Sequence, residues 1–311
     1  MNAKPKLLIT LGDIAGIGPE IVAKAWPKLS IYCHPVVIGD PARLPAGVDC
    51  VNPSPVDLSK VQLGIVSPAA GQAAYDWLVY AIDECLAGRA DGIVTCPLHK
   101  EGLHAAGVNY PGHTEILADR TRAPFHAMLL YDDDLPLAVA HVTLHMALNT
   151  VFPSITVESV FDKIRLLHEI LPRLTGRPAR IGVAALNPHA SDGGLFGNEE
   201  QSIIAPAIVA ARTEGITVDG PIPSDAIFLP HNRSRFDGIV AMYHDQGHIA
   251  MKLLGGRRAV NITAGLPIVR TSVAHGTAYD IAGQGIADES SLLSAVRVAA
   301  RLAKGSKPEP Q

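Results

Sequence analysis

The 311-residue sequence has few cysteines, no cluster of basic residues and no long apolar run. The four cysteines are Cys33, Cys50, Cys85 and Cys96, and no C-x-x-C spacing occurs among them. This argues against a disulfide framework and against a thiolate zinc site. The 26 basic and 30 acidic side chains nearly balance, and no basic stretch is interleaved with aromatic residues. The apolar run near the N-terminus is too short for a secretory signal or a membrane span. We therefore expect a cytoplasmic, globular protein with neither nucleic acid nor membrane as a partner.

The sequence also lacks a nucleotide-binding fingerprint. The segment GDIAGIGPE at 12–20 precedes an expected helix, but its glycines do not match G-x-G-x-x-G and no Walker lysine follows. We therefore assign Gly16 and Gly18 to a tight turn near the site rather than to a pyrophosphate site. No internal repeat is visible, and the composition of 305–311 predicts a disordered tail.

What the sequence does contain is an alternation of helical and strand patterns. Apolar residues recur at helical spacing over 74–86, over 160–171, where Pro172 is expected to end the helix, and over 291–302. Apolar runs of strand length lie between these helices, at 7–10, 92–95, 127–130, 137–143, 181–186 and 238–243. The alternation predicts an α/β fold with a mostly parallel sheet that helices cover on both faces.

Three histidines follow the ends of separate strands, where ligands bind in open α/β sheets: His145, His189 and His244. Each histidine alone is more typical of an ordinary core or surface residue than of a metal ligand, but their shared placement favours a metal site. Three neutral imidazoles with an open fourth position suit Zn²⁺ or another divalent first-row ion. Asp225 and Asp245 are candidate carboxylates to orient the rings. Cys96 also lies beside a loop, but without a paired base it is interpreted as a buried small residue.

Two further groups of residues are typical of anion binding. His113 and Thr114 lie where a helix is expected to begin, and backbone N–H groups, a hydroxyl and an imidazole there suit a phosphate or carboxylate. A simple N-cap role for Thr114 is the alternative. Lys252, Asn261 and Arg270 follow His244 in a largely apolar, glycine-rich stretch, where an isolated charge needs a partner or a function.

Taken together, these loops resemble the 4-hydroxythreonine-4-phosphate dehydrogenase (PdxA) family over nearly the whole chain. Six blocks are similar, in family order: GIGPE at 16–20, PLHKEGLHAAG at 97–107, YPGHTE at 110–115, LNPHA at 186–190, MYHDQGH at 242–248 and VNITAGLPIVRTS at 260–272. The segment HGTAYDIAGQGIAD at 275–288 is similar to the adenine-side loop of isocitrate and isopropylmalate dehydrogenases. Ile14 departs from the family, which usually has proline there, and the stretch from Pro41 to Ser67 is short.

The resemblance implies a two-lobed isocitrate/isopropylmalate dehydrogenase-like fold with the active site in the interlobe cleft. It places lobe 1, on the cofactor side, at 1–122 plus 262–311, and lobe 2, with the metal ligands and the dimer interface, at 123–261. It also implies a homodimer whose metal ligands, His145, His189 and His244, are shared across the interface. Substrate contacts would come from His113, Thr114, Lys252, Asn261 and Arg270. NAD contacts would come from His275, Gly276, Thr277, Ala278, Asp280 and Ile281.

The corresponding hypothesis is an NAD-dependent oxidation, assisted by Zn²⁺ or by Mg²⁺, Co²⁺, Mn²⁺ or Ni²⁺, of a small phosphorylated hydroxy acid. The metal lowers the pKa of the substrate hydroxyl, hydride passes to NAD⁺, and the resulting β-keto acid loses CO₂. Lys252 is the candidate for proton transfer, with Asp225 and Asp245 as supporting carboxylates.

Two substrates and three rival functions stay open at this point. The substrate is 4-phosphohydroxythreonine or a 4-phosphorylated sugar acid such as threonate or erythronate, and NAD is not distinguished from NADP. One rival is a cis-dihydrodiol carboxylate dehydrogenase of the same family, which needs no phosphate site. The others are a zinc hydrolase that uses the three histidines to activate water, and a metal-dependent binding protein without chemistry.

Overall fold

The computed structural model describes residues 4–255 and 258–305, which divide into two compact units. Unit 1 comprises residues 1–124 and 260–311, and unit 2 comprises residues 125–259. The tail that the composition predicts to be disordered lies, apart from Gly305, outside the described residues. None of the described helices combines the length and the apolar character that a membrane span requires.

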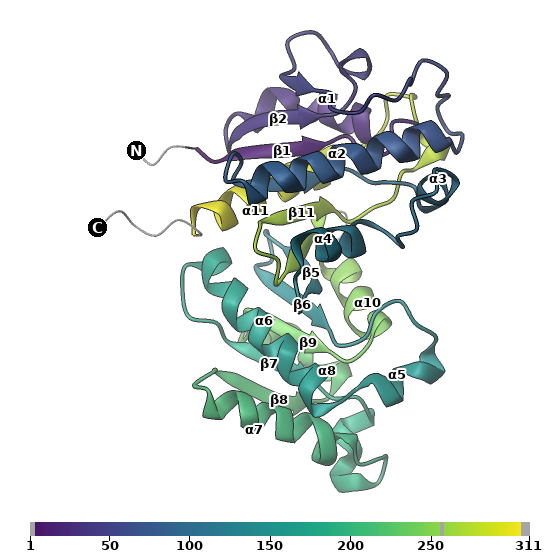
Figure 1. Ribbon diagram of the computed structural model, residues 1–311. Helices are drawn as coiled ribbons and strands as arrows, with labels where there is room; N and C mark the ends of the chain where they lie inside the picture. Colours follow the sequence, from purple (N-terminus) through teal and green to yellow (C-terminus); the bar gives the residue numbers. More distant parts are fainter. Residues whose placement is uncertain (1–3, 256–257, 306–311) are drawn as a thin grey trace. The chain divides into compact units, whose positions relative to one another are not determined.

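Unit 1 is a mostly parallel sheet with helices packed on it (Figure 1). Its elements, in chain order, are β1 (Lys6–Thr10), α1 (Gly18–Leu29), β2 (His34–Ile38), η1 (Pro41–Arg43), β3 (Cys50–Val51), α2 (Pro68–Leu86), β4 (Gly92–Thr95), α3 (Lys100–Ala105), α4 (His113–Thr121), β10 (Val260–Ala264), β11 (Arg270–Val273), η5 (Tyr279–Ile281) and α11 (Ser290–Lys304). The strand order is β3-β2-β1-β4-β11-β10, and among these strands only the β10–β11 hairpin is antiparallel.

Helices α2 and α11 cover this sheet. Both contact β1 and β4 without substantial contact with each other, so they lie on opposite faces. Ser67 caps helix α2, and its hydroxyl accepts a hydrogen bond from the Ala70 N–H. Pro68 fits the first turn because an N–H at that position would have no partner within the helix. On the sheet side of α2, Trp77 is fully buried, and its indole N–H donates to Asn52 at 2.9 Å.

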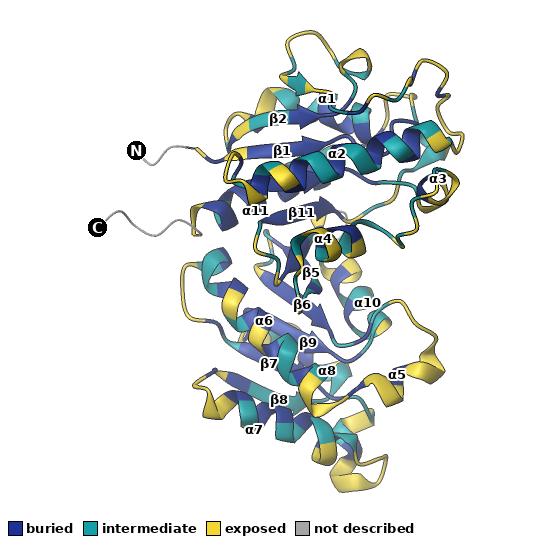
Figure 2. Ribbon diagram, viewed as in Figure 1, coloured by how far each residue is buried: buried dark blue, intermediate teal, exposed yellow. Residues whose placement is uncertain are grey.

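Unit 2 also consists of mostly parallel strands with helices packed on them. Its elements are β5 (Ala127–Asp132), β6 (Leu137–His141), α5 (Leu148–Ser154), α6 (Val157–Thr175), β7 (Ile181–Ala184), η2 (Pro188–Gly194), the π-helix η3 (Glu200–Ile204), α7 (Ala205–Thr213), β8 (Val218–Ile222), α8 (Ser224–Ile227), α9 (Pro230–Arg233), β9 (Gly238–Ala241) and α10 (His244–Gly255). The strand order is β5-β6-β9-β7-β8, with only β5–β6 antiparallel. Figure 2 shows the central strands of both units in the buried colour, whereas β2 and β8 are only partly buried and most exposed residues lie in loops and on outer helix faces.

The six apolar runs all form strands, and β4 has the predicted bounds. Three of the strands, β6, β7 and β9, end two residues before the apolar run does. In each case the last apolar residues already belong to the loop that carries a candidate histidine. The prediction of a mostly parallel α/β fold is therefore confirmed.

One predicted helix end was wrong. Helix α6 continues through Pro172 to Thr175 and ends at Gly176, which adopts a left-handed φ of 72°. Proline costs one backbone hydrogen bond, but the buried side chains of Leu171 and Leu174 hold the last turn against the sheet. The Gly176 N–H donates to the Pro172 carbonyl at 2.8 Å, so this carbonyl of the last turn has a hydrogen-bond partner although the helix ends here.

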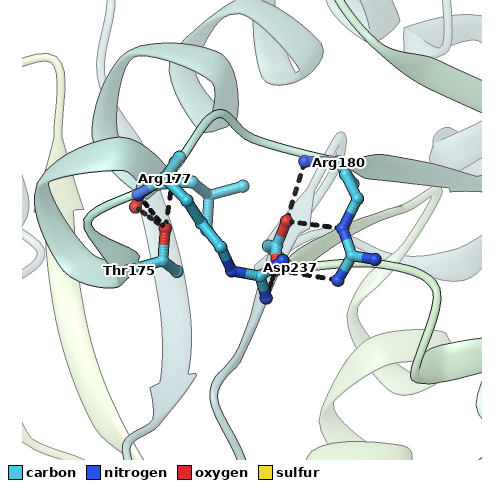
Figure 3. Close-up of polar contacts among 5 residues, drawn as sticks. Thr175, Arg177, Arg180 and Asp237 are labelled. Carbon is cyan, nitrogen blue, oxygen red and sulfur yellow. Dashed lines mark hydrogen bonds and ion pairs between the residues drawn. The ribbon is translucent and has the colours of Figure 1, made fainter.

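A buried carboxylate fixes the amino-terminal side of the unit 2 sheet (Figure 3). Asp237, which directly precedes β9, has no exposed surface. It accepts hydrogen bonds from the backbone N–H of Arg180 at 2.9 Å and from the guanidinium groups of Arg180 and Arg177. Removing one partner of such a pair leaves a buried charge without compensation, so this cluster ties the α6–β7 connection firmly to β9.

Candidate functional site

In unit 1, Arg270 is a buried cation whose hydrogen-bond partners among the described residues are neutral. Its side chain is 2% exposed, and its two terminal nitrogens donate to the hydroxyls of Thr263 at 2.9 Å and Thr95 at 2.7 Å. The Nε atom has no hydrogen-bond partner among the described residues. Burial lowers the pKa of Arg270 to about 9, partly offset by Glu115, so the group remains a cation at neutral pH. A buried guanidinium held in this way is suited to a bound anion.

Of the other predicted anion-binding residues of unit 1, His113 lies within electrostatic reach of this guanidinium. His113 is the first residue of α4, and burial, with the charge of Arg270, lowers its pKa well below the ordinary histidine value. A neutral imidazole keeps one N–H donor for an anion without adding a second charge. Asn261, on β10, has a buried Oδ1 without a hydrogen-bond partner in the described part of the chain. Thr95 and Thr263 were missed by the sequence reasoning, because a threonine in an apolar strand gives no local signal.

The predicted cofactor residues lie on the loop around η5, which the 12–20 turn holds in place. The Ile17 N–H donates to the Thr277 carbonyl at 3.0 Å, and the Tyr279 hydroxyl donates to Asp13 at 2.7 Å. Glu20 accepts from the N–H groups of Gly285 and Ala287 at 3.2 and 2.8 Å. These contacts agree with a structural role for the 12–20 turn beside the site.

Asp13 and Tyr279 form a polar contact that the sequence did not reveal. Burial raises the pKa of Asp13 even though it accepts hydrogen bonds from Tyr279 and from the Ala15 N–H. Burial, followed by the hydrogen bond with Asp13, also raises the pKa of Tyr279. The His99 ring stacks on the Tyr279 ring with 4.6 Å between centroids. The loop after β4 therefore also supports η5.

In unit 2, two of the three candidate metal ligands lie close together. The ring centroids of His145 and His244 are 5.8 Å apart. His244 begins α10, and its Nδ1 lies 2.7 Å from Asp245, which leaves Nε2 for a ligand. Among the described residues, no group of three histidine, cysteine, aspartate or glutamate side chains within this one chain is arranged to hold a metal ion.

The third candidate, His189, lies on the exposed turn η2. Its Nδ1 is 3.2 Å from Asp192, and its ring meets Phe196 edge-on at 6.3 Å. Of the remaining candidates in unit 2, Asp225 is exposed on α8. Lys252 is exposed on α10, four residues after His248 and hence on the same helix face as that residue.

Three unit 2 residues near the histidines escaped the sequence reasoning. His248 stacks on His244 at 3.8 Å between centroids, and its Nδ1 lies 3.1 Å from Nε2 of the buried His141. Burial, followed by neighbouring histidines, lowers the pKa of His141 to about 3 and that of His248 to about 4. The Gln246 amide donates to the Ala185 carbonyl and accepts from the Met242 N–H, which joins the loops after β7 and β9.

Cys96 plays no visible chemical part. It is fully buried, and burial raises the pKa of its thiol to about 12, so a thiolate is disfavoured at neutral pH. The interpretation of Cys96 as a small buried residue is therefore confirmed.

Residues 31–299 match the family model described as pyridoxal phosphate biosynthetic protein PdxA. The chain belongs to the PdxA family. It is 45% identical to 4-hydroxythreonine-4-phosphate dehydrogenase of Beijerinckia indica, with 95% of this chain and 94% of that protein covered. It is 43% identical to D-threonate 4-phosphate dehydrogenase of Cupriavidus necator, with coverage of 96% and 97%. The predicted family is confirmed, and the predicted enzyme class, a dehydrogenase, agrees with both names.

Solved structures support the same assignment. A PdxA-family structure, 4-hydroxythreonine-4-phosphate dehydrogenase from Klebsiella pneumoniae, has a TM-score of 0.87 and 37% identity, with 96% of this chain and 99% of that chain covered. A terephthalate 1,2-cis-dihydrodiol dehydrogenase from Burkholderia xenovorans has a TM-score of 0.69 and 30% identity, with coverage of 96% and 98%. A beta-decarboxylating dehydrogenase from Thermococcus kodakarensis, at 17% identity, TM-score 0.52 and coverage of 95% and 81%, shares the fold alone.

This PdxA-family chain offers the donors of part of a metal site, the neighbouring imidazoles of His145 and His244 with Asp245 beside His244 Nδ1. Imidazole nitrogens are the donors that Zn²⁺, Co²⁺ and Ni²⁺ prefer, and the carboxylate beside His244 Nδ1 is the usual arrangement for a metal-binding histidine. In unit 1, backbone groups of Thr277, Gly285 and Ala287 are already engaged by the 12–20 turn and α1, so the loop around η5 is preformed rather than folded by a ligand.

Proposed function

We propose that this chain is an NAD-dependent, metal-assisted dehydrogenase that oxidises and then decarboxylates a small phosphorylated hydroxy acid. The observation that carries the proposal is the buried Arg270, held by two threonine hydroxyls beside a neutral His113. Among the described residues Arg270 donates no hydrogen bond to a carboxylate, and Glu115 only partly offsets the burial of its charge. Such a desolvated cation is costly unless a ligand supplies more negative charge. The names of the relatives, dehydrogenases of 4-phosphorylated hydroxy acids, support a phosphate as that ligand.

Each unit has a distinct part in the proposed reaction. In unit 1, His113, Thr114, Asn261 and Arg270 would hold the phosphate or carboxylate, and residues 275–281 would hold the nicotinamide cofactor, whose chemistry is to accept hydride. In unit 2, His145 and His244, with His189 of a second copy, would hold a divalent metal ion, whose chemistry is that of a Lewis acid. Asp245 fixes the His244 ring, and we propose Asp225 as a further orienting carboxylate. Lys252 delivers the proton that replaces CO₂ on carbon.

The rival with most support is the cis-dihydrodiol dehydrogenase, because a structure of that activity is 30% identical to this chain. The carboxylate substrate of that activity carries no phosphate dianion, which is the ligand that best matches the buried charge of Arg270. A zinc hydrolase would make no use of the preformed loop around η5. We therefore favour the phosphorylated substrate, of either the hydroxythreonine or the sugar-acid type.

Reduction of NAD⁺ by candidate substrates tests the proposal. The substrates are 4-phosphohydroxythreonine, 4-phosphothreonate, 4-phosphoerythronate and an unphosphorylated dihydrodiol, each with and without a chelator. We expect NADH and CO₂ from at least one phosphorylated acid, loss of activity with chelator, and recovery on adding Zn²⁺ or Co²⁺. Turnover of the dihydrodiol alone, or full activity in the presence of chelator, contradicts the proposal.

A further inference from the structure

The carboxylate of Glu200 lies beneath the loop that carries His189. Its side chain is 3% exposed although it lies only a few residues from exposed loop positions. One oxygen accepts from the backbone N–H groups of Leu186 at 2.9 Å and Asn187 at 2.7 Å, and the other accepts from the Asn187 side-chain amide at 2.9 Å. Burial opposes ionisation, yet hydrogen bonds with Asn187 and Ser191 hold the pKa of Glu200 below its ordinary value. The group is therefore an anion that gathers the N–H donors of residues 186–187.

The turn that follows these residues is strained. His189, Ala190, Ser191 and Asp192 have φ values of 54°, 55°, 63° and 41°, and Gly193 continues the left-handed run at 69°. Four consecutive non-glycine residues in this region are unfavourable, and such a conformation persists only where the surrounding structure holds it. Glu200 holds the chain immediately before the run, and Asp192 lies against the His189 ring within it.

We propose that Glu200 is a positioning residue for His189: by fixing residues 186–187 it holds the left-handed turn that presents the imidazole to a metal ion. The proposal rests on the proposed function, in which His189 is a metal ligand. Metal affinity is higher when the ligands are already in place before the ion binds. If the ion must first order a loop, the free energy needed for that ordering weakens binding. Glutamine at position 200 would turn an NH₂ group toward N–H donors and lose part of this network.

The chain offers a matched control in Asp237. Both carboxylates are buried in unit 2 and accept several N–H hydrogen bonds, but Asp237 lies before β9, where Arg177 and Arg180 surround it (Figure 3). Glu200→Gln and Asp237→Asn are both expected to lower the urea midpoint of the full-length protein. Only Glu200→Gln should weaken Co²⁺ binding, by about tenfold or more, and change the visible absorption of the Co²⁺ protein.

Titrations with Co²⁺ alone separate the two proposals. If wild-type protein does not bind Co²⁺, or His189→Ala binds it as tightly as wild type, the proposed metal site fails. If His189→Ala loses binding while Glu200→Gln binds with wild-type affinity and spectrum, only the role of Glu200 is overturned. Equal weakening by Asp237→Asn also overturns it, because the effect is then general stability. If Glu200→Gln does not fold, Asn187→Ala decides: weaker Co²⁺ binding supports the proposal and unchanged binding overturns it.

Discussion

At the scale of single residues, the geometry of the Arg270 guanidinium distinguishes it from any other cation. Its planar group reaches Thr95 and Thr263 at once, whereas an ammonium is a point charge that cannot hold both and still face a ligand. Arg270→Lys should therefore raise KM for the phosphorylated substrate by about tenfold or more. Steady-state kinetics with varied substrate measure this. Arg89→Lys, which changes an exposed arginine paired with Glu84, is the control and should keep wild-type KM.

A second residue-scale prediction concerns His113 and pH. Its folded-state pKa lies well below 6.5, so in acid the unfolded chain binds a proton at this position that the folded protein does not. The stabilisation is complete above about pH 6.5 and is lost as pH falls from there toward the folded pKa, with a limiting slope of about 1.4 kcal/mol per pH unit. His113→Gln should flatten the fall in free energy of unfolding between pH 7.5 and 5.5. If urea unfolding shows the same fall in free energy of unfolding between the two pH values for both proteins, the prediction is contradicted.

At the scale of elements, the 12–20 turn and the loop around η5 act together. An added Cβ at Gly16 would lie 2.6 Å from the Thr277 carbonyl oxygen. This oxygen is backbone and cannot move without moving residues 275–281, which we propose as the cofactor loop. Gly16→Ala should raise KM for NAD⁺ by roughly tenfold, equivalent to about 1.4 kcal/mol.

The control for this variant is Gly92→Ala. Its Cβ would crowd the Val269 side chain at 3.0 Å, away from the cofactor loop but within the same unit. It should lower the thermal midpoint while leaving KM for NAD⁺ unchanged. If Gly16→Ala folds correctly by circular dichroism and its KM for NAD⁺ is unchanged, the 12–20 turn has no role in cofactor binding.

The element scale also shows what the sequence can predict. Runs such as 92–95 are continuously apolar because both faces of a central parallel strand are covered, so they were found. Strand β8 contains glycine and proline, and β10–β11 contains Asn261 and Arg270 within a glycine-bearing hairpin, so these strands were not predicted. The site divides in the same way. Loop histidines stand out in sequence, but hydroxyls such as Thr95 acquire meaning only when distant strands pair beside Arg270.

At the scale of the whole molecule, the position of His189 argues for a site built from two chains. Within one chain, His145 and His244 lie together, but no described set of three ligands includes His189. The residues just after its turn, Leu195 and Phe196, are 79% and 50% exposed, which is typical of a surface that a partner covers.

Mixed dimers test this arrangement directly. Homodimers of His244→Ala and of His189→Ala each lack one ligand at every site and should be inactive. If the ligands are shared across a twofold interface, a mixed dimer contains one site missing both ligands and one intact site. Random pairing makes about half of the dimers mixed, so co-expression should restore about a quarter of wild-type NADH production and Co²⁺ binding. If all three ligands came from one chain, no site in the mixture would be complete and no activity would return.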